Sequence, residues 1–475
     1  MRWLRTQFIE RKLDGWLGLG LGLSLAAGCV TLYALLPLKI ALLATAAIIG
    51  MPLLFFALVD LTFGLQLTIA AGFLIGLAAK YTTAPIGTLL DLLMTWLIFG
   101  LLVRLASEKH MHYATNPISL CIVIWIGYNL LQAINPVAGS RLAWIYTVRS
   151  VALLLLLYFV ALRAFESRKE VFRALRAILF WSFVAALYGL KQEFLGFTPT
   201  EMAWLHADAL RFQLIYQWGR LRIFSFFSDP TTYGILMAYI SVACFILAAG
   251  NWQWWKRLLL ALGGISMWLA IAYAGSRTPV VMVPAGIAFA TLLSLNRRSL
   301  TISIAVFLIG AAFMMKSTHS AVIYRLQSAF RPTEDASLQL RLKNQEKIQP
   351  FIQSHPFGAG LGSTGYWGKR FTPDSWLANF AHDSLYVRLA VETGWVGLLL
   401  YMILLFAALQ QGIYWYYRVH APSLKLVYLA LVTCVFMLAL ASYPQEAITL
   451  LPNSLIFYLM LAMIVRIKDF DTPHS

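Results

Sequence analysis

The sequence predicts an all-α polytopic membrane protein, and three observations support this fold class. Of the 475 residues, 60% are hydrophobic and only 12% are charged, about half the charged fraction of a typical soluble protein. The mean hydropathy is +0.73. The apolar residues form continuous blocks of about 20 residues, the length that crosses a bilayer as a helix. A transmembrane barrel would instead show alternating segments of about 10 residues.

The apolar blocks give fourteen candidate spans, or about 12–14 transmembrane helices if short or closely spaced blocks are merged. In chain order they are residues 15–36, 38–59, 62–79, 86–103, 117–134, 143–162, 173–190, 231–249, 258–275, 279–295, 301–315, 384–409, 425–442 and 453–467. The first block is too long for a cleaved signal peptide, so we interpret it as a retained span.

The whole chain, residues 1–475, is therefore expected to form a single integral membrane domain. Its expected regions, in order, are an N-terminal helix bundle at 15–190, an outer segment at 191–230, central spans at 231–315, a large and partly helical outer loop at 316–383, and C-terminal spans at 384–467. Long loops of this kind are uncommon in compact folds and are often functional.

The positive charges orient these spans. If the basic N-terminus lies in the cytoplasm, every short basic loop falls on the same side: Arg104 and Lys109, Arg163 to Lys169, Lys256 and Arg257, Arg297 and Arg298, Arg418, and Arg466 and Lys468. This is the positive-inside distribution, which places both termini in the cytoplasm and both long segments outside. It also accounts for the net charge of +17 without nucleic acid as a partner.

The cysteines predict neither a metal site nor a disulfide framework. All of them lie in apolar blocks, where cysteine behaves as a small hydrophobic residue, and no CxxC spacing occurs. They are Cys29, Cys121, Cys244 and Cys434.

Two arginines lie where outer segments meet apolar spans. Arg222 begins the run Arg-Ile-Phe-Ser-Phe-Phe-Ser-Asp-Pro, which ends at Pro230 before a span, and Arg277 lies between two spans with almost no loop. An arginine near membrane depth is costly and is a functional hypothesis by default. The alternative for each is an interfacial anchor whose charged end reaches water.

The large outer loop contains Arg341 and then a glycine-rich run from His355 to Gly362, His-Pro-Phe-Gly-Ala-Gly-Leu-Gly. Its Gly358, Gly360 and Gly362 allow the backbone to approach a ligand closely, and consecutive amides in such turns can hold an anion. The run does not follow a strand, so it is not a dinucleotide fingerprint.

His382 and Asp383 stand at the start of the next apolar helix. Asp383 or Ser384 can cap that helix, and the positive end of the helix dipole favours a neutral His382 that can accept a proton. The alternative is a surface histidine beside an ordinary cap. Taken together, arginines suited to phosphate and a basic histidine indicate a phosphate-bearing lipid substrate on the outer face.

These motifs resemble the O-antigen ligase and O-antigen polymerase superfamily of bacterial envelope glycosyltransferases. The resemblance lies in Arg222 to Pro230, in Ser276-Arg277, in Arg341 with the glycine-rich run, and in His382-Asp383 followed by Gly394-Trp-Val-Gly397. It covers about residues 215–410. Asp383 stands where the family usually has asparagine.

The resemblance implies a multi-pass protein of the bacterial inner membrane with its active site on the periplasmic face. It implies transfer of a glycan from an undecaprenyl-diphosphate-linked donor to a glycan or lipid A core acceptor, without a metal or other cofactor. In this interpretation Arg222, Arg277 and Arg341 bind the diphosphate and His382 is catalytic. The supporting residues are Asp383, Gly358, Gly360, Gly362, Gly394 and Gly397, and His355 is the alternative base.

Polymerase activity on surface polysaccharide repeat units is the favoured prediction, because residues 387–394 and 135–149 resemble exopolysaccharide polymerases. Ligation to lipid A core is the alternative in lipopolysaccharide biosynthesis. A transporter of lipid-linked glycans would place charges around a midplane cavity, whereas the polar residues here lie mostly on one side. A non-catalytic assembly partner is a further alternative.

Overall fold

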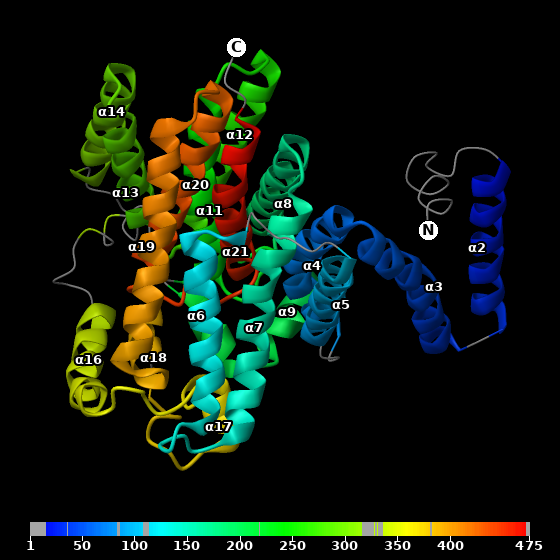
Figure 1. The fold of residues 1–475 in the computed structure, drawn as a ribbon, viewed down its shortest axis with the longest axis horizontal. Helices are drawn as coiled ribbons and strands as arrows, with labels where there is room; N and C mark the ends of the chain where they lie inside the picture. Colours follow the sequence, from blue (N-terminus) through cyan, green and yellow to red (C-terminus); the bar gives the residue numbers. More distant parts are fainter. Residues whose placement is uncertain are drawn as a thin grey trace.

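The computed structural model describes residues 16–35, 37–82, 86–107, 114–217, 219–315, 327, 330, 336–380 and 382–471. Within these residues the chain is almost entirely helical (Figure 1). The described strands are the short antiparallel pair β1 (Tyr216–Gln217) and β2 (Arg220–Leu221), in which Tyr216 pairs with Leu221. The predicted all-α membrane fold is therefore confirmed.

Each of the fourteen predicted spans overlaps a helix. These helices are α2 (Trp16–Leu35), α3 (Leu38–Val59), α4 (Leu61–Tyr81), α5 (Gly87–Ser107), α6 (Pro117–Leu131), α7 (Arg141–Ala164), α8 (Arg168–Phe194), α11 (Pro230–Ala248), α12 (Trp254–Ala274), α13 (Arg277–Ser294), α14 (Arg297–Met315), α19 (Gly394–Arg418), α20 (Pro422–Ala441) and α21 (Asn453–Arg466).

Ten helices are long and apolar enough to cross a membrane, counted over the part of the chain that the structure describes. They are α4 to α8, α11 to α13, α19 and α20. Helix α21 has 14 residues, fewer than the roughly 20 that a bilayer requires. The predicted span at 384–409 is wrong at its start, because the chain there forms the short helix α18 (Leu385–Glu392), breaks, and continues as α19.

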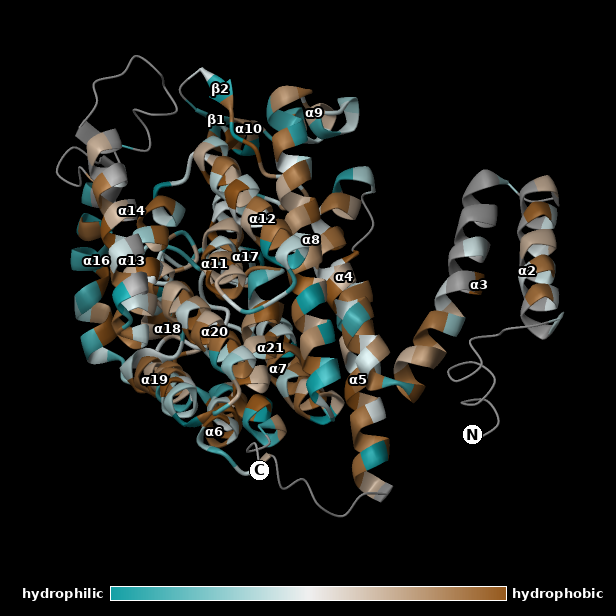
Figure 2. Cartoon of the chain, turned by 90° about the horizontal axis from the view of Figure 1, so that it is seen from above, coloured by the Kyte–Doolittle hydropathy of each residue, from teal (hydrophilic) through white to brown (hydrophobic). Residues whose placement is uncertain are grey.

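Helices α11, α20 and α21 form the centre of the bundle (Figure 1). In an apolar stretch of 18 residues taken from each helix, 78% of the residues of α11 and 72% of those of α20 are buried. The same fraction is 33% for α12 and for α19. Helices α7, α8, α12, α13 and α19 surround this centre. Hydrophobic residues occur on inner and outer helices alike (Figure 2), as expected where the surrounding solvent is lipid.

Helices α2 and α3 form an antiparallel pair that stands to one side of the bundle (Figures 1 and 2). The pair joins the rest through the end of α3, which packs against α4 and α5. Trp16 and Leu23 are largely exposed on α2.

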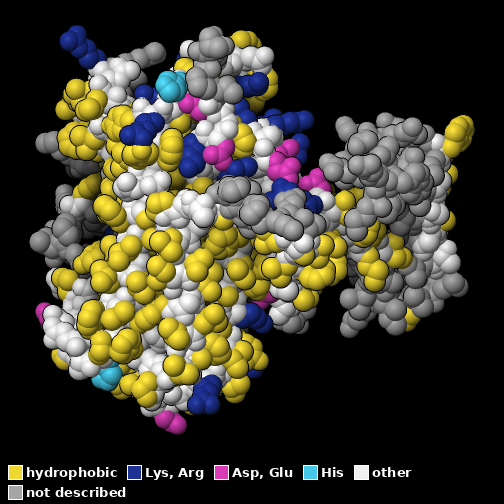
Figure 3. Space-filling model, in the orientation of Figure 1, with side chains coloured by type: hydrophobic (Ala, Val, Ile, Leu, Met, Phe, Trp, Pro, Cys, Tyr) yellow, Lys and Arg dark blue, Asp and Glu magenta, His cyan; other side chains and the backbone are white. Residues whose placement is uncertain are grey.

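Both long polar segments lie at one end of the bundle. The first contains α9 (Pro199–His206), α10 (Ala209–Ile215) and the strand pair; the second contains α16 (Ala336–Ser354) and α17 (Gly365–Phe371). Hydrophobic side chains cover most of the face shown in Figure 3, and Lys and Arg side chains gather mainly at the opposite end from α16 and α17.

The break between α18 and α19 depends on close backbone packing. Ala359 and Gly360 donate backbone hydrogen bonds to the last carbonyls of α18, and Val396 donates to Pro356. Gly394 has φ +72°, and a Cβ atom there would lie 1.9 Å from the carbonyl oxygen of Pro356. Only glycine satisfies both the backbone angle and this distance.

We expect Gly394→Ala to lower the free energy of unfolding, because a left-handed alanine costs about 1–2 kcal/mol before any clash is counted. Thermal unfolding of the purified protein in detergent measures this effect. Gly127→Ala is the matched control, since a Cβ on Gly127 meets nothing within 4 Å and alanine favours a helix by up to about 1 kcal/mol. Equal stability of the two variants would contradict this explanation of the break.

Candidate functional site

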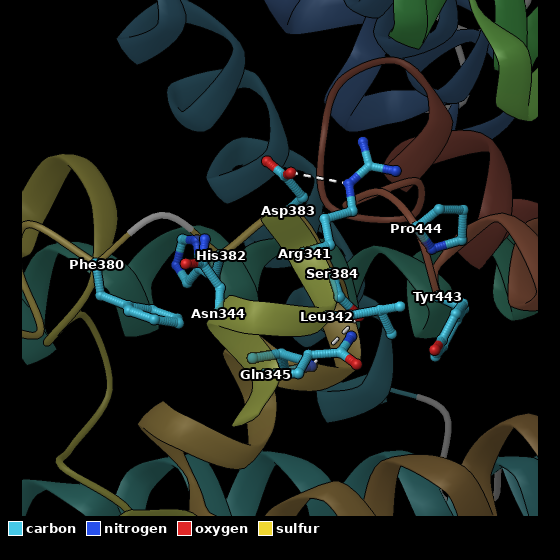
Figure 4. A pocket seen from close by; sticks show the side chains of 11 residues that line it. Arg341, Leu342, Asn344, Gln345, Phe380, His382, Asp383, Ser384, Tyr443 and Pro444 are labelled. Atoms are coloured by element: carbon cyan, nitrogen blue, oxygen red, sulfur yellow. Dashed lines mark hydrogen bonds and ion pairs between the residues drawn. The ribbon is translucent and has the colours of Figure 1, made fainter. Parts of the chain in front are cut away.

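Three segments of the chain meet around an open hollow at the end of the bundle that carries the polar segments (Figure 4). They are the first half of α16, the residues that lead into α18, and the turn that follows α20. The lining residues are Arg341, Leu342, Asn344, Gln345, Phe380, His382, Asp383, Ser384, Val387, Tyr443 and Pro444.

Arg341 and Asp383 form an ion pair at the rim of this hollow. The Nε atom of Arg341 lies 2.9 Å from Oδ2 of Asp383, and both side chains are partly exposed. Ser384, not Asp383, caps α18, because its side chain accepts a hydrogen bond from the amide of Val387. Of the two residues predicted as possible caps, Ser384 is therefore the cap, whereas Asp383 pairs with Arg341.

The His382 side chain is only 9% exposed, and each of its ring nitrogens faces a different partner. Its Nε2 atom lies 2.6 Å from Oγ1 of Thr364. Its Nδ1 atom lies 3.7 Å from Oε1 of Glu446. His382 precedes the cap of α18 by two residues, so the predicted position at a helix N-terminus is confirmed.

A largely buried ion network lies next to His382. Arg388 on α18 donates to Oε2 of Glu446 at 2.7 Å, and its Nε lies 3.4 Å from Oε1 of Glu392. Glu392 in turn accepts a 2.5 Å hydrogen bond from the hydroxyl of Thr364. The arginine thus links Glu446, which faces His382, to Glu392, which binds Thr364.

Sequence reasoning missed Thr364, Arg388, Glu392 and Glu446 as site residues. Two signals were present. Arg388 and Glu392 are charged residues four apart in an apolar helix, a spacing that puts them on one face. Glu446 is the acidic residue of a short polar turn between two apolar helices.

The glycine-rich run serves backbone packing. The amides of Gly358, Ala359 and Gly360 donate to the carbonyls of His355, Val391 and Glu392, so these three amides are not available to an anion. Added Cβ atoms would clash with neighbouring backbone or side chains at all five supporting glycines: Gly358, Gly360, Gly362, Gly394 and Gly397. Their support of the site is therefore mechanical.

Arg222 and Arg277 lie together at the α12–α13 turn and do not line the hollow. The Nε of Arg222 donates to the carbonyl of Ala274, the last residue of α12, and Arg277 is the first residue of α13. Burial lowers the pKa of Arg222 to about 10, against the raising effect of Asp229. Arg222 therefore remains charged at neutral pH.

His355 is separate from this arrangement. Its ring stacks on Phe351 at 4.1 Å, and its Nδ1 lies 2.9 Å from both the Ser354 hydroxyl and the Phe351 carbonyl. It is not a lining residue of the hollow. Among the residues that the structure describes, no group of three or more His, Cys, Asp or Glu side chains could hold a metal ion.

Comparison with known families agrees with the motifs. Residues 262–402 match the O-antigen ligase family. This match supports the resemblance to the O-antigen ligase and polymerase superfamily. The predicted resemblance is thus confirmed, while no curated protein matches the sequence.

The O-antigen ligase match contains Arg277, Arg341 and His382, together with the newly identified Thr364 and Arg388. Arg222 and Glu446 lie outside the matched residues, on either side. The structure brings Glu446 to within 3.7 Å of His382, so the site extends beyond the segment that carries the family pattern.

We expect Asp383→Asn to raise the affinity for an anionic lipid-linked donor, because it releases the charge of Arg341. The pair is partly exposed, and such pairs contribute about 0.2–1 kcal/mol, so the expected gain is up to about 5-fold. Binding of the donor to purified protein measures it. Asp374→Asn, which removes the same charge from an exposed position elsewhere in the loop, is the control. Weaker binding by Asp383→Asn would show that Asp383 positions Arg341 instead.

Proposed function

We propose that this protein is a glycosyltransferase that acts at the periplasmic face of the bacterial inner membrane. It transfers a glycan from an undecaprenyl-diphosphate-linked donor to an acceptor hydroxyl and so polymerises surface polysaccharide repeat units. The observation that carries the proposal is the partly enclosed His382, held between Thr364 and Glu446 beside a hollow that also contains Arg341.

The orientation follows from the charges. Both polar segments lie at one end of the bundle, and Lys and Arg gather mainly at the other end (Figures 1 and 3). The positive-inside rule then puts the basic end and both termini in the cytoplasm. In this orientation, the hollow opens to the periplasm, where lipid-linked glycans are available and nucleotide sugars are scarce.

The reaction is a substitution at the anomeric carbon of the donor sugar. The acceptor oxygen forms a new bond to this carbon while the bond to the diphosphate oxygen breaks. The acceptor proton passes to His382, and undecaprenyl diphosphate leaves with the bonding electron pair. The diphosphate is a good leaving group and the hydroxyl is a weak nucleophile, so base assistance to the hydroxyl accelerates the reaction more than acid assistance to the leaving group.

The arginines supply the positive charge for the diphosphate. Arg222 and Arg277 flank the N-terminus of α13, and helix N-termini themselves favour anions. Arg341 lies beside His382 in the hollow. A planar guanidinium binds two phosphate oxygens at once and stays charged, which suits each of these positions to a lipid-linked diphosphate.

Ligation of glycan to lipid A core is the second candidate, because ligases and polymerases share these motifs. Deletion of the gene in a strain with a defined surface glycan distinguishes the two. Loss of long chains with single repeat units retained on lipid A identifies a polymerase. Loss of all glycan from lipid A identifies a ligase. Glycan transfer by the purified protein alone would exclude a transporter and a non-catalytic assembly partner.

Lysine is expected to replace the three arginines poorly, because it lacks the bidentate guanidinium. Loss of one charge-assisted contact costs about 1.5–3 kcal/mol, or roughly 10- to 150-fold in kcat/KM. We would measure transfer by Arg222→Lys, Arg277→Lys and Arg341→Lys at equal expression. Arg211→Lys is the control, since the guanidinium of Arg211 donates to the carbonyl of Trp204 and stacks on its ring within the same outer segment. Full activity in all three variants would remove the diphosphate role.

Substitution of His382 should separate chemistry from donor binding. We expect His382→Ala to slow single-turnover transfer by about 10²- to 10⁴-fold while donor affinity persists, because the arginines provide most of the binding. His355→Ala tests the other histidine of the loop and should leave transfer nearly unchanged. If only the His355 variant loses transfer, the assignment of the base is wrong.

A further inference from the structure

We infer that Thr364 and Glu392 fix His382 in the tautomer that carries its proton on Nε2, so that Nδ1 is the atom that accepts the proton of the acceptor hydroxyl. We further infer that Glu446 stabilises the imidazolium that forms. Thr364, Glu392 and Glu446 are then positioning residues. This inference rests on the proposed function of His382 as the general base.

The ion pair between Glu392 and Arg388 sets the direction of the hydrogen bonds. Its carboxylate is 2% exposed and lies 3.4 Å from the guanidinium Nε of Arg388. Paired with this guanidinium as a carboxylate, Glu392 only accepts hydrogen bonds. It accepts from the hydroxyl of Thr364 at 2.5 Å, and the backbone amide of Thr364 lies 3.4 Å from the same oxygen.

The donor in the hydrogen bond between Thr364 and His382 follows from this. Thr364 has one hydroxyl proton, and it donates this proton in the hydrogen bond to Glu392. The remaining lone pairs of Oγ1 can only accept, so the Nε2 atom of His382, 2.6 Å away, is the donor. A neutral imidazole carries one proton, and Nδ1 is therefore the unprotonated, basic nitrogen. Thr364 is 1% exposed, which removes competition from water for this bond.

The surroundings of Nδ1 suit a proton acceptor. Oε1 of Glu446 lies 3.7 Å from it, beyond the 2.7–3.2 Å of a hydrogen bond, so no direct bond holds a proton there in the resting state. Once Nδ1 takes a proton, the carboxylate faces a positive ring. The attraction exists only after proton transfer begins, which is the condition for an interaction to accelerate the reaction.

The net charge of the Arg388, Glu392 and Glu446 network also favours a positive charge on His382. Arg388 alone would disfavour a second positive charge nearby. It is paired with the two carboxylates of Glu392 and Glu446, so the three groups together carry one negative charge. The other charged residues that line the hollow, Arg341 and Asp383, are paired with each other and cancel to first order.

Thr364→Val and Thr364→Ser form the test. Both side chains fit the buried site, and only serine keeps the hydroxyl that relays the hydrogen bond. With purified full-length protein and an undecaprenyl-diphosphate-linked repeat unit, we expect Thr364→Val to slow single-turnover transfer by about 10- to 100-fold with donor affinity unchanged. Thr364→Ser should stay within about 3-fold of the wild type. Glu446→Gln should slow transfer by about 10- to 100-fold with donor affinity unchanged.

The tautomer itself is observable in the wild-type protein. Nitrogen-15 spectra of histidine-labelled protein, compared with His382→Ala, identify the His382 signals and show which nitrogen carries the proton at neutral charge. A proton on Nδ1 would overturn the inference even if the Thr364 variants failed to fold. Equal transfer by Thr364→Val and Thr364→Ser would also overturn the tautomer inference. In that case, loss of transfer in His382→Ala would still support the proposed function. Normal transfer by His382→Ala would instead overturn the proposed function.

Discussion

The pairing of Arg388 with Glu392 and Glu446 is the interaction on which the site depends. Glu392 belongs to the same short helix, and Glu446 belongs to the turn after α20. Removing one partner from a buried ion pair leaves an uncompensated charge and typically costs about 3–5 kcal/mol. The chain must therefore bring α18 and the α20–α21 turn together before the site exists. Leu385 adds a backbone hydrogen bond to Ser442 at the same junction.

A second constraint places the outer loop on this junction. The glycine-rich run docks on the break between α18 and α19 through backbone hydrogen bonds, and Gly358 and Gly394 permit the approach. Thr364 lies two residues after this run. The docking therefore determines where its hydroxyl stands relative to Glu392 and His382. The hydrogen bonds of His382 therefore depend on the packing of the loop.

The helices could be predicted from the sequence because lipid requires long apolar segments whose backbone hydrogen bonds are satisfied internally. The individual site residues were harder. His382 and Arg341 stand out as polar residues beside apolar helices, and the structure does place both at one hollow. Glycine is required equally by a ligand and by a neighbouring backbone, so the sequence could not show that Gly358 and Gly360 serve packing. Glu446 stands out locally only as an acidic residue in a turn, and its contact with His382, like the contacts of Thr364, is long-range and absent from any local pattern.

The charges at the site are divided in a way that the proposed reaction requires. A departing diphosphate needs positive charge, whereas a base that becomes an imidazolium needs negative charge nearby. If the positive and negative groups lay side by side, each would weaken the effect of the other on the substrate or the histidine. Opposite charges at about 4 Å attract each other strongly at low effective dielectric. Here Arg222 and Arg277 lie at the α12–α13 turn, and the carboxylates of Glu446 and Glu392 lie next to His382 and its partner Thr364. Arg341 lies beside His382 but is held by Asp383. Placing the two kinds of charge on different segments of the chain lets one end of the bundle favour both the leaving group and the proton acceptor.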